Sequence, residues 1–103
     1  MVGIDIVDIT RLARSIERFG NHFLDRLFTV QEIEYAQAKR RMAESLAGRF
    51  AAKEAFIKAY GAKPGWREIE VLQHDGRPYI MFKGKTYPNV SISHERLYAV
   101  AVV

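Results

Sequence analysis

Two carboxylates stand in apolar stretches of the sequence, where a charge needs a partner. Asp5 interrupts the run MVGIDIV at residues 1–7, and Glu54 lies within AESLAGRFAAKEAFIKAYG at residues 43–61. Charged side chains in such settings are paired, bound to a metal or bound to a ligand. Because the chain has no cysteine, the available oxygen donors favour a hard cation such as Mg²⁺. For Asp5, a turn or cap role at the end of a strand is the alternative.

Three basic side chains, Arg49, Lys53 and Lys58, accompany Glu54 on the same stretch. Mg²⁺ is commonly held by one or two carboxylates together with substrate phosphates, and arginine and lysine both bind phosphate. The group therefore predicts phosphate chemistry rather than hydrolysis of peptides or sugars. The alternative is that the lysines reach solvent and that Glu54 pairs with Lys58, four residues further along a helix.

His94 ends the segment SISH. We interpret it as a general acid or base, or as a phosphate contact, which requires the carboxylates to lie nearby. The alternative is a hydrogen-bonded surface histidine. Ser93 and His94 point to opposite faces of a strand, and the sequence has no G-x-S-x-G segment, so a serine triad is excluded. The sequence also has no Walker A motif and no dinucleotide-binding fingerprint.

A long helix over residues 43–61 has to position most of these side chains. Alanine and large apolar residues cover most of its circumference, which predicts burial, and Gly61 is placed to end it. Thr29 and Glu32 form a T-x-x-E capping box, and Asp75-Gly76 predicts a hairpin turn. The other expected helices cover residues 8–20, 22–28 and 30–39, and the expected strands cover residues 1–7, 69–74, 78–83, 90–94 and 97–103.

This order of elements predicts an α+β fold, with helices packed on one face of a small, mostly antiparallel sheet. A length of 103 residues predicts a single domain over residues 1–103. A sheet that is covered on one face leaves apolar surface, and a subunit interface would cover it.

The chain is basic, with a net charge of +4 and a pI of about 9.6. This balance suits nucleic acid, anionic lipid, a phosphorylated ligand or an acidic protein. Arg11, Arg14 and Arg18 share one face of the first helix, so they form either a docking surface for an acidic partner or a solvated face. We interpret the basic triplet at residues 39–41 as a helix-end and solvent feature. No run has the length of a transmembrane helix, and the first residues lack a signal-peptide layout.

Several motifs resemble the holo-[acyl-carrier-protein] synthase family, the small bacterial type of 4′-phosphopantetheinyl transferase. The resemblance covers nearly the whole chain, and HDGRPYI at residues 74–80 is similar to the hairpin of the family. The combination of GRFAAKEA with S-x-S-H is the most specific part. The matching segments are GIDIV at residues 3–7, FTVQE at 28–32, ESLAGRFAAKEAFIKAYG at 44–61 and VSISHE at 90–95.

The resemblance implies a phosphopantetheinyl-transferase-like domain and a Mg²⁺-dependent reaction. The 4′-phosphopantetheine group of coenzyme A would be transferred to a serine of an apo acyl carrier protein, with release of adenosine 3′,5′-bisphosphate. It further implies a cytoplasmic enzyme of fatty acid and lipid metabolism, and a homotrimer with each active site at a subunit boundary. Neither nucleic acid nor a membrane is an expected partner.

Position within the motifs also implies roles for individual residues. Lys58 matches a lysine that positions or stabilises the phosphates, Arg49 matches a basic residue near the nucleotide part of coenzyme A, and Arg11 matches a carrier-docking residue. We extend docking to Arg14 and Arg18 because they share its face. The expected metal ligands are Asp5 and Glu54. The expected catalytic residues are Asp5, Glu54, Lys58 and His94. The expected coenzyme A contacts are Arg49, Lys53, Lys58 and His94.

The chain departs from the family pattern at two connections. The segment at residues 62–65 is less glycine-rich than usual, and Lys63 there would substitute for backbone contacts to phosphate. The connection over residues 83–89 is too short for the helix that many members place before the S-x-S-H strand, so we expect a loop there. Two other functions are considered: a basic nucleic-acid-binding module, which lacks an aromatic and basic platform, and an inactive transferase that acts as a subunit.

Overall fold

The structure, a computed structural model, describes residues 1–61 and 64–103, so the expectation for Lys63 lies outside the described residues. Within them the chain forms four α-helices, a 3-10 turn and six strands. In chain order these are β1 (Ile4–Asp8), α1 (Ile9–Phe19), α2 (Asn21–Leu27), α3 (Val30–Gln37), α4 (Met42–Tyr60), η1 (Trp66–Glu68), β2 (Ile69–His74), β3 (Arg77–Phe82), β4 (Lys85–Tyr87), β5 (Ser91–His94) and β6 (Tyr98–Val102).

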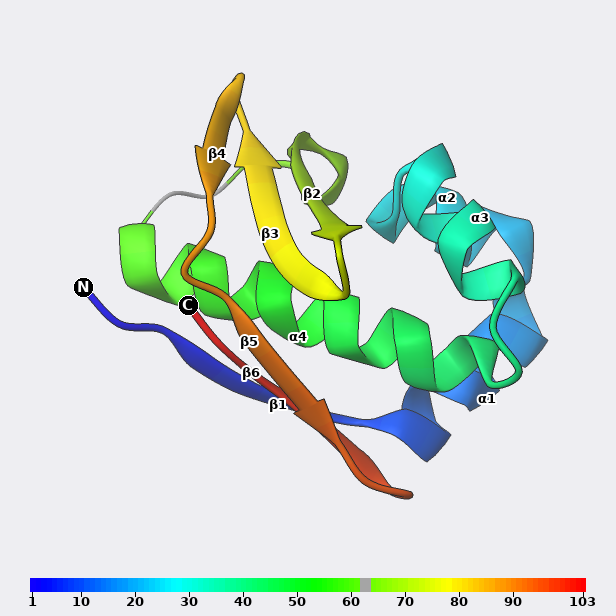
Figure 1. Cartoon of the computed structure of the whole chain (residues 1–103). Coiled ribbons are helices and arrows are strands. Elements are labelled where there is room, and N and C mark those ends of the chain that lie inside the picture. Colours follow the sequence, from blue (N-terminus) through cyan, green and yellow to red (C-terminus); the bar gives the residue numbers. More distant parts are fainter. Residues whose placement is uncertain (62–63) are drawn as a thin grey trace.

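The α+β class is confirmed, but the described strands form two sheets instead of one. One sheet has the order β1-β6-β5 and the other the order β2-β3-β4, and neighbouring strands in both are antiparallel. Figure 1 shows α4, in green, running between the two sheets, with α1 to α3 gathered near its N-terminal end. The C-terminal strand β6 is central in its sheet, as its apolar sequence predicts.

Local sequence explains where the helices begin and end. The Asp8 carboxylate accepts a hydrogen bond from the backbone N–H of Arg11 at 3.0 Å and caps α1. The predicted capping box of Thr29 and Glu32 is present at the start of α3. Gly61 ends α4 with φ of +68°, in the left-handed region that glycine adopts without strain.

The connection over residues 83–89 is not only a loop, because it contains β4. The expectation of a plain connection was wrong at this point. Lys83 and Gly84 both adopt positive φ, at 51° and 75°, and so form a tight turn that returns the chain beside β3. Asp75 and Gly76 make the corresponding turn between β2 and β3, with φ of 51° and 77°, as predicted.

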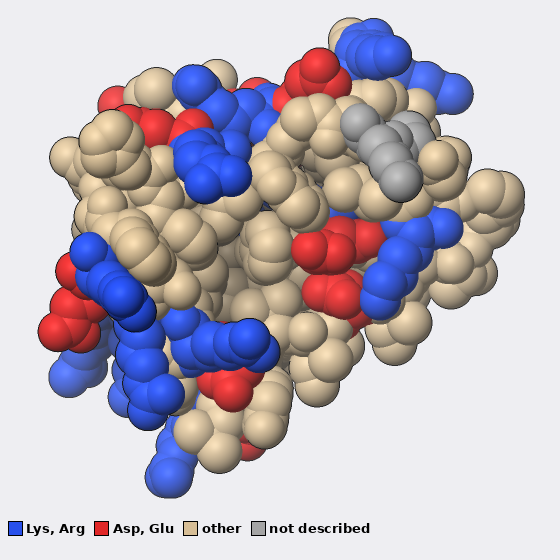
Figure 2. Space-filling model, turned by 180° about the vertical axis from the view of Figure 1, so that it is seen from behind, with Lys and Arg blue, Asp and Glu red and all other residues tan. Residues whose placement is uncertain are grey.

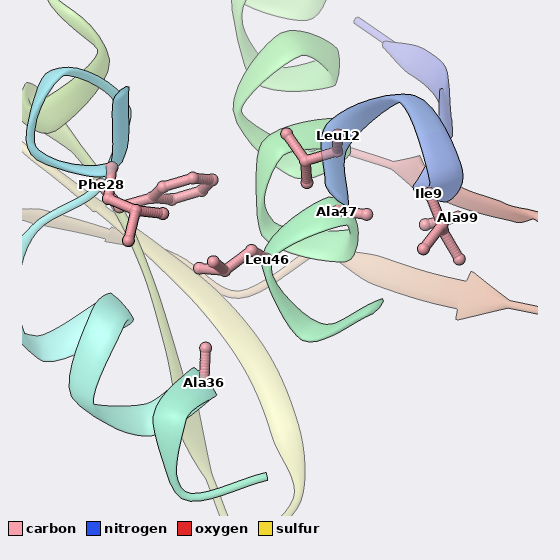
Figure 3. Packing of buried hydrophobic residues seen from close by; sticks show 8 residues of the cluster. Ile9, Leu12, Phe28, Ala36, Leu46, Ala47 and Ala99 are labelled. Carbon is pink, nitrogen blue, oxygen red and sulfur yellow. The ribbon is translucent and has the colours of Figure 1, made fainter. Parts of the chain in front are cut away.

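The long helix α4 carries two apolar cores. Figure 3 shows the first, in which Leu46 and Ala47 of α4 meet residues of α1, α3 and β6. The second joins the C-terminal half of α4 to both sheets through Ala51, Ala52, Ala55, Phe56, Ile69, Val71, Ile80 and Ala101. No described helix is long and apolar enough to cross a membrane.

Two glycines allow the sheet to approach α4 closely. A Cβ on Gly3 would lie 1.8 Å from the carbonyl oxygen of Ala55, and a Cβ on Gly48 would lie 2.9 Å from Cγ2 of Ile92. The first contact is with the helix backbone, which cannot move aside as a side chain can. Glycine at position 3 therefore sets how near β1 lies to α4.

Candidate functional site

Strand β1 points Asp5 towards α4. Its neighbours Ile4 and Ile6 are exposed, as the alternation of a strand requires, while the side chain of Asp5 is only 16% exposed. The Asp5 carboxylate accepts a hydrogen bond from Lys58 Nζ of α4 at 3.0 Å, and the same ammonium group donates to the Ile4 carbonyl at 3.0 Å. Asp5 therefore has a structural partner, but one whose side chain remains 55% exposed.

Glu54 of α4 lies in the electrostatic field of Asp5. Partial burial raises the pKa of the Glu54 carboxyl above its ordinary value, and the negative charge of Asp5 raises that pKa further, while Lys58 opposes both effects. Two carboxylates and one lysine leave local negative charge uncompensated. Such a pair of carboxylates suits a divalent cation. No third histidine, cysteine, aspartate or glutamate completes a metal-binding cluster with them among the described residues.

Asp5 and Glu54 both line a cavity of about 600 Å³, which we call the carboxylate cavity. One wall is apolar and includes Leu27 and Phe50. Arg11 of α1 lies on the same rim. The full lining is Asp5, Ile6, Val7, Asp8, Arg11, Leu12, Ser15, Phe23, Leu27, Phe50, Glu54 and Tyr98. The predicted metal ligands and one predicted docking arginine are thus brought together.

His94 and Arg49 line a different cavity, of about 460 Å³, which we call the arginine cavity. His94 Nδ1 lies 3.4 Å from Glu44 Oε1. Strands β1 and β5 are the two edges of one sheet, with β6 between them, and among the described residues the two cavities have no lining residue in common. In a single chain, His94 and Arg49 therefore line a different cavity from the carboxylates, and α4 contributes residues to both cavities.

Arg49 is a buried cation with an unused donor. It is 5% exposed, and its guanidinium carbon lies 4.0 Å from the centre of the Tyr35 ring. Nη1 donates to Ser45 Oγ at 3.4 Å, but within the described part of the chain nothing accepts a hydrogen bond from Nε. Burial lowers the pKa of Arg49, and contact with Tyr35 partly offsets this. The arrangement suits an anionic ligand.

Three further basic residues were missed as site candidates. Lys39, Arg40 and Arg41, which the sequence indicated only as a helix-end feature, line the arginine cavity beside Arg49. Their run of three charges in the connection before α4 was the available signal. Four basic side chains in one cavity indicate a ligand with several negative charges.

The comparisons with known proteins decide the family. The family model described as "4'-phosphopantetheinyl transferase superfamily" matches residues 1–103. The chain belongs to this superfamily. It is 44% identical to the holo-[acyl-carrier-protein] synthase of Koribacter versatilis over 116 aligned positions, which cover 98% of this chain and 93% of the relative.

Solved structures of the transferase superfamily share the fold. The holo-[acyl-carrier-protein] synthase of Helicobacter pylori, solved in complex with coenzyme A, matches with a TM-score of 0.86 and 31% identity over 99% of this chain and 96% of that one. The enzyme from Bacillus anthracis, solved in complex with CoA (3',5'-ADP), matches with a TM-score of 0.85 and 34% identity over 98% and 90%.

Within this transferase fold, Lys53 does not lie where the sequence prediction required. Its side chain is fully buried, and its ammonium group donates to Glu32 Oε1 at 2.7 Å and to the carbonyls of Leu27 and Trp66 at 2.7 and 3.0 Å. Three protein acceptors occupy the three donors of the ammonium group. The surroundings of Lys53 therefore do not support a phosphate contact.

The remaining predicted residues of the transferase lie on the exposed face of α1. Arg11, Arg14 and Arg18 are all exposed, and Arg18 lies 5.2 Å from the centre of the Phe19 ring. Figure 2 shows basic side chains gathered over the α1 region of the face seen from behind. Arg11, at one end of this row of three arginines, also lines the carboxylate cavity. A negatively charged partner bound along α1 would therefore reach the predicted metal ligands.

Proposed function

We propose that this chain transfers the 4′-phosphopantetheine group of coenzyme A to a serine of apo acyl carrier protein. The observation that carries the proposal is the pair of carboxylates, Asp5 and Glu54, in one cavity beside Lys58 and Arg11. Membership of the transferase superfamily supports it, as do relatives named holo-[acyl-carrier-protein] synthase and a similar structure solved with coenzyme A. The second product is adenosine 3′,5′-bisphosphate.

Asp5 and Glu54 would hold Mg²⁺. The uncompensated negative charge at this pair and the absence of cysteine from the sequence fit a hard cation. When bound, Mg²⁺ would neutralise charge on the pyrophosphate and on the leaving phosphate. Two protein oxygens leave other coordination positions to phosphate and water, which is the usual arrangement for this ion.

The chain's own charged residues have separate roles in this proposal. Lys58 orients phosphate beside the carboxylates, and Arg49 with the basic triplet binds the nucleotide end of coenzyme A in the arginine cavity. His94 positions phosphate or exchanges a proton with the reacting groups. Arg11, Arg14 and Arg18 steer an acidic carrier to the carboxylate cavity.

A homotrimer would bring the two cavities together at each subunit boundary. In one chain the two cavities share no lining residue among those described, so the arginine cavity of one copy would have to face the carboxylate cavity of the next. The outer face of the β1-β6-β5 sheet supports this, because Ile4, Ile6 and Val102 are exposed there. A cytoplasmic location and a role in fatty acid synthesis complete the proposal.

The proposal predicts modification of a carrier protein. Incubation of the protein with coenzyme A, Mg²⁺ and an apo acyl carrier protein should add one phosphopantetheine group, measured by intact mass of the carrier. A chelator should abolish the mass gain, and excess Mg²⁺ should restore it, because the carboxylates alone supply no positive charge to the phosphates. A folded protein that gives no mass gain with a competent carrier would reject the proposed function.

A shared site predicts that two inactive variants restore activity together. Glu54→Gln damages one cavity and His94→Ala damages the other, so each should be inactive alone. In oligomers formed by co-expression in equal amounts, about one quarter of boundaries would combine two intact halves. Transfer should then recover to about a quarter of the wild-type rate. Absence of recovery in a mixed oligomer, verified by mass, would place both halves of the site in one chain.

A further inference from the structure

Lys53 and Glu32 form a buried ion pair that the proposed reaction does not use. Both side chains are 0% exposed, and Nζ of Lys53 lies 2.7 Å from Oε1 of Glu32. The ammonium group also binds the carbonyl of Leu27, the last residue of α2, and the carbonyl of Trp66, the first residue of η1. One lysine of α4 thus connects the ends of three separate segments.

Glu32 extends the same network to β2. Its Oε1 accepts a hydrogen bond from the Thr29 backbone N–H at 2.8 Å, and its Oε2 accepts one from the Val71 backbone N–H at 2.8 Å. The Thr29 hydroxyl donates to Glu70 of β2 at 2.6 Å. Within the described residues, every hydrogen bond of the two side chains is either to backbone or between Glu32 and Lys53, so the network is specific in geometry.

The network borders the carboxylate cavity through residues that line it. Lys53 precedes Glu54 in α4, so the anchored lysine fixes the rotation of the helix that sets the direction of Glu54. Leu27, whose carbonyl Lys53 binds, lines the cavity, and so does Phe50. The Phe50 ring packs 5.1 Å from the ring of Trp66, whose backbone carbonyl is the other carbonyl that accepts a hydrogen bond from Lys53.

The energetics favour a role in geometry over a role in stability. A buried ion pair adds little net stability compared with apolar packing, since desolvation of the two charges opposes their attraction. Its hydrogen bonds nevertheless permit only one arrangement of the segments that it connects. The apolar cores on either side of α4 already supply packing.

We propose that the Glu32–Lys53 pair is a positioning element that holds Glu54 towards Asp5 and the Leu27–Phe50 wall around them. Lys53 acts through its neighbours and touches neither coenzyme A nor metal. This inference rests on the proposed function, because it assigns the carboxylates to Mg²⁺.

The test compares a neutral replacement of the pair with a packing control. Lys53→Met alone leaves the buried Glu32 charge without a partner, which destabilises the fold strongly. The double variant Glu32→Gln, Lys53→Met removes both charges with similar shapes. Ile80→Ala removes a buried side chain of the second core; Ile80 lies opposite Val71 in the sheet, but its side chain makes no hydrogen bond to Glu32 or Lys53. Thermal unfolding shows whether the two variants lose comparable stability.

Mg²⁺ affinity is measured by calorimetry with coenzyme A present and no carrier, and coenzyme A affinity is measured separately with chelator. The double variant should bind Mg²⁺ at least about tenfold more weakly and coenzyme A within about threefold of the wild-type affinity, because neither Glu32 nor Lys53 lines the arginine cavity. Ile80→Ala should retain both affinities.

Three results would overturn the inference. They are Mg²⁺ affinity unchanged in the double variant, Mg²⁺ affinity equally reduced in Ile80→Ala, and loss of coenzyme A affinity with Mg²⁺ binding intact. Loss of coenzyme A affinity alone would instead support the sequence-based prediction that Lys53 contacts phosphate. A wild-type protein that transfers nothing rejects the proposed function instead. If the proposed function fails, crystal structures of the double variant and of Ile80→Ala test the inference. The inference requires that the distance between the Asp5 and Glu54 carboxylates increases in the double variant and not in Ile80→Ala.

Discussion

Glu54→Gln is expected to lower the rate of phosphopantetheine transfer by roughly 100-fold or more, since even the partners of metal ligands typically contribute 10–100-fold. The amide keeps the shape of the side chain but removes the charge that a hard cation requires. Asp5→Asn should have an effect of the same order. Rates are measured by carrier mass at saturating coenzyme A over a Mg²⁺ titration. Near-normal turnover in both variants would reject the metal assignment.

The same Glu54→Gln variant should be at least as stable as the wild-type protein at neutral pH without Mg²⁺. Burial and the charge of Asp5 raise the pKa of Glu54 in the folded protein. The unfolded chain therefore releases the Glu54 proton first, and the free energy of unfolding of the wild type falls as pH rises from the unfolded pKa through the folded pKa. Glutamine has no such proton.

Denaturant unfolding of both proteins at a series of pH values checks this sign. The stability difference should favour the variant increasingly as pH rises across that window and stay constant below the unfolded pKa. A variant that is less stable at neutral pH than at acid pH, relative to wild type, would contradict the raised pKa. Inactivity combined with retained stability would also exclude misfolding as the cause of the lost transfer.

Gly3→Ala is expected to damage both stability and transfer, although position 3 bears no functional group. The added Cβ would lie 1.8 Å from the Ala55 carbonyl oxygen and 2.9 Å from the Ala59 backbone nitrogen, so β1 must move away from α4. Overpacking of this kind typically costs about 1–3 kcal/mol. Asp5 would move with β1 and away from Glu54, and a displacement of about 1 Å can lower a rate roughly 100-fold.

Gly65→Ala is the matched control. At that position the nearest atom to an added Cβ is 3.9 Å away, in Glu68, and φ is −63°, so alanine fits without strain. Denaturant unfolding and the carrier assay are compared for both variants. Equal behaviour of Gly3→Ala and Gly65→Ala would show that the close approach of β1 to α4 is not needed.

The local elements of the fold could be predicted because their signals are short. Gly61 marks the end of α4, Thr29 and Glu32 mark the start of α3, and Asp75-Gly76 marks a hairpin. The division of the strands into two sheets could not be predicted in this way, since alternation shows that a strand has a buried face but not which strand lies beside it. The lysine in the Lys83-Gly84 turn gave no comparable signal for β4.

The candidate site was predictable in composition but not in arrangement. Asp5 and Glu54 were found because a charge in an apolar run is unusual at the level of sequence. Lys53 and Lys58 looked alike on α4, yet one is buried against Glu32 and the other reaches Asp5. A helical period shows which face a residue occupies, whereas its role depends on the segment that packs there. Glu32, read only as a cap, forms the partner of Lys53.

The contact between Lys58 and Asp5 has a consequence for the order of events at the site. In the structure the ammonium group is a tethered counter-ion for one of the two carboxylates. A divalent cation at Asp5 would compete with this contact and would release a positive group on a long, half-exposed side chain. That group then becomes available to phosphate. Cation binding and phosphate binding would therefore reinforce each other, and by linkage each would strengthen the other by the same factor.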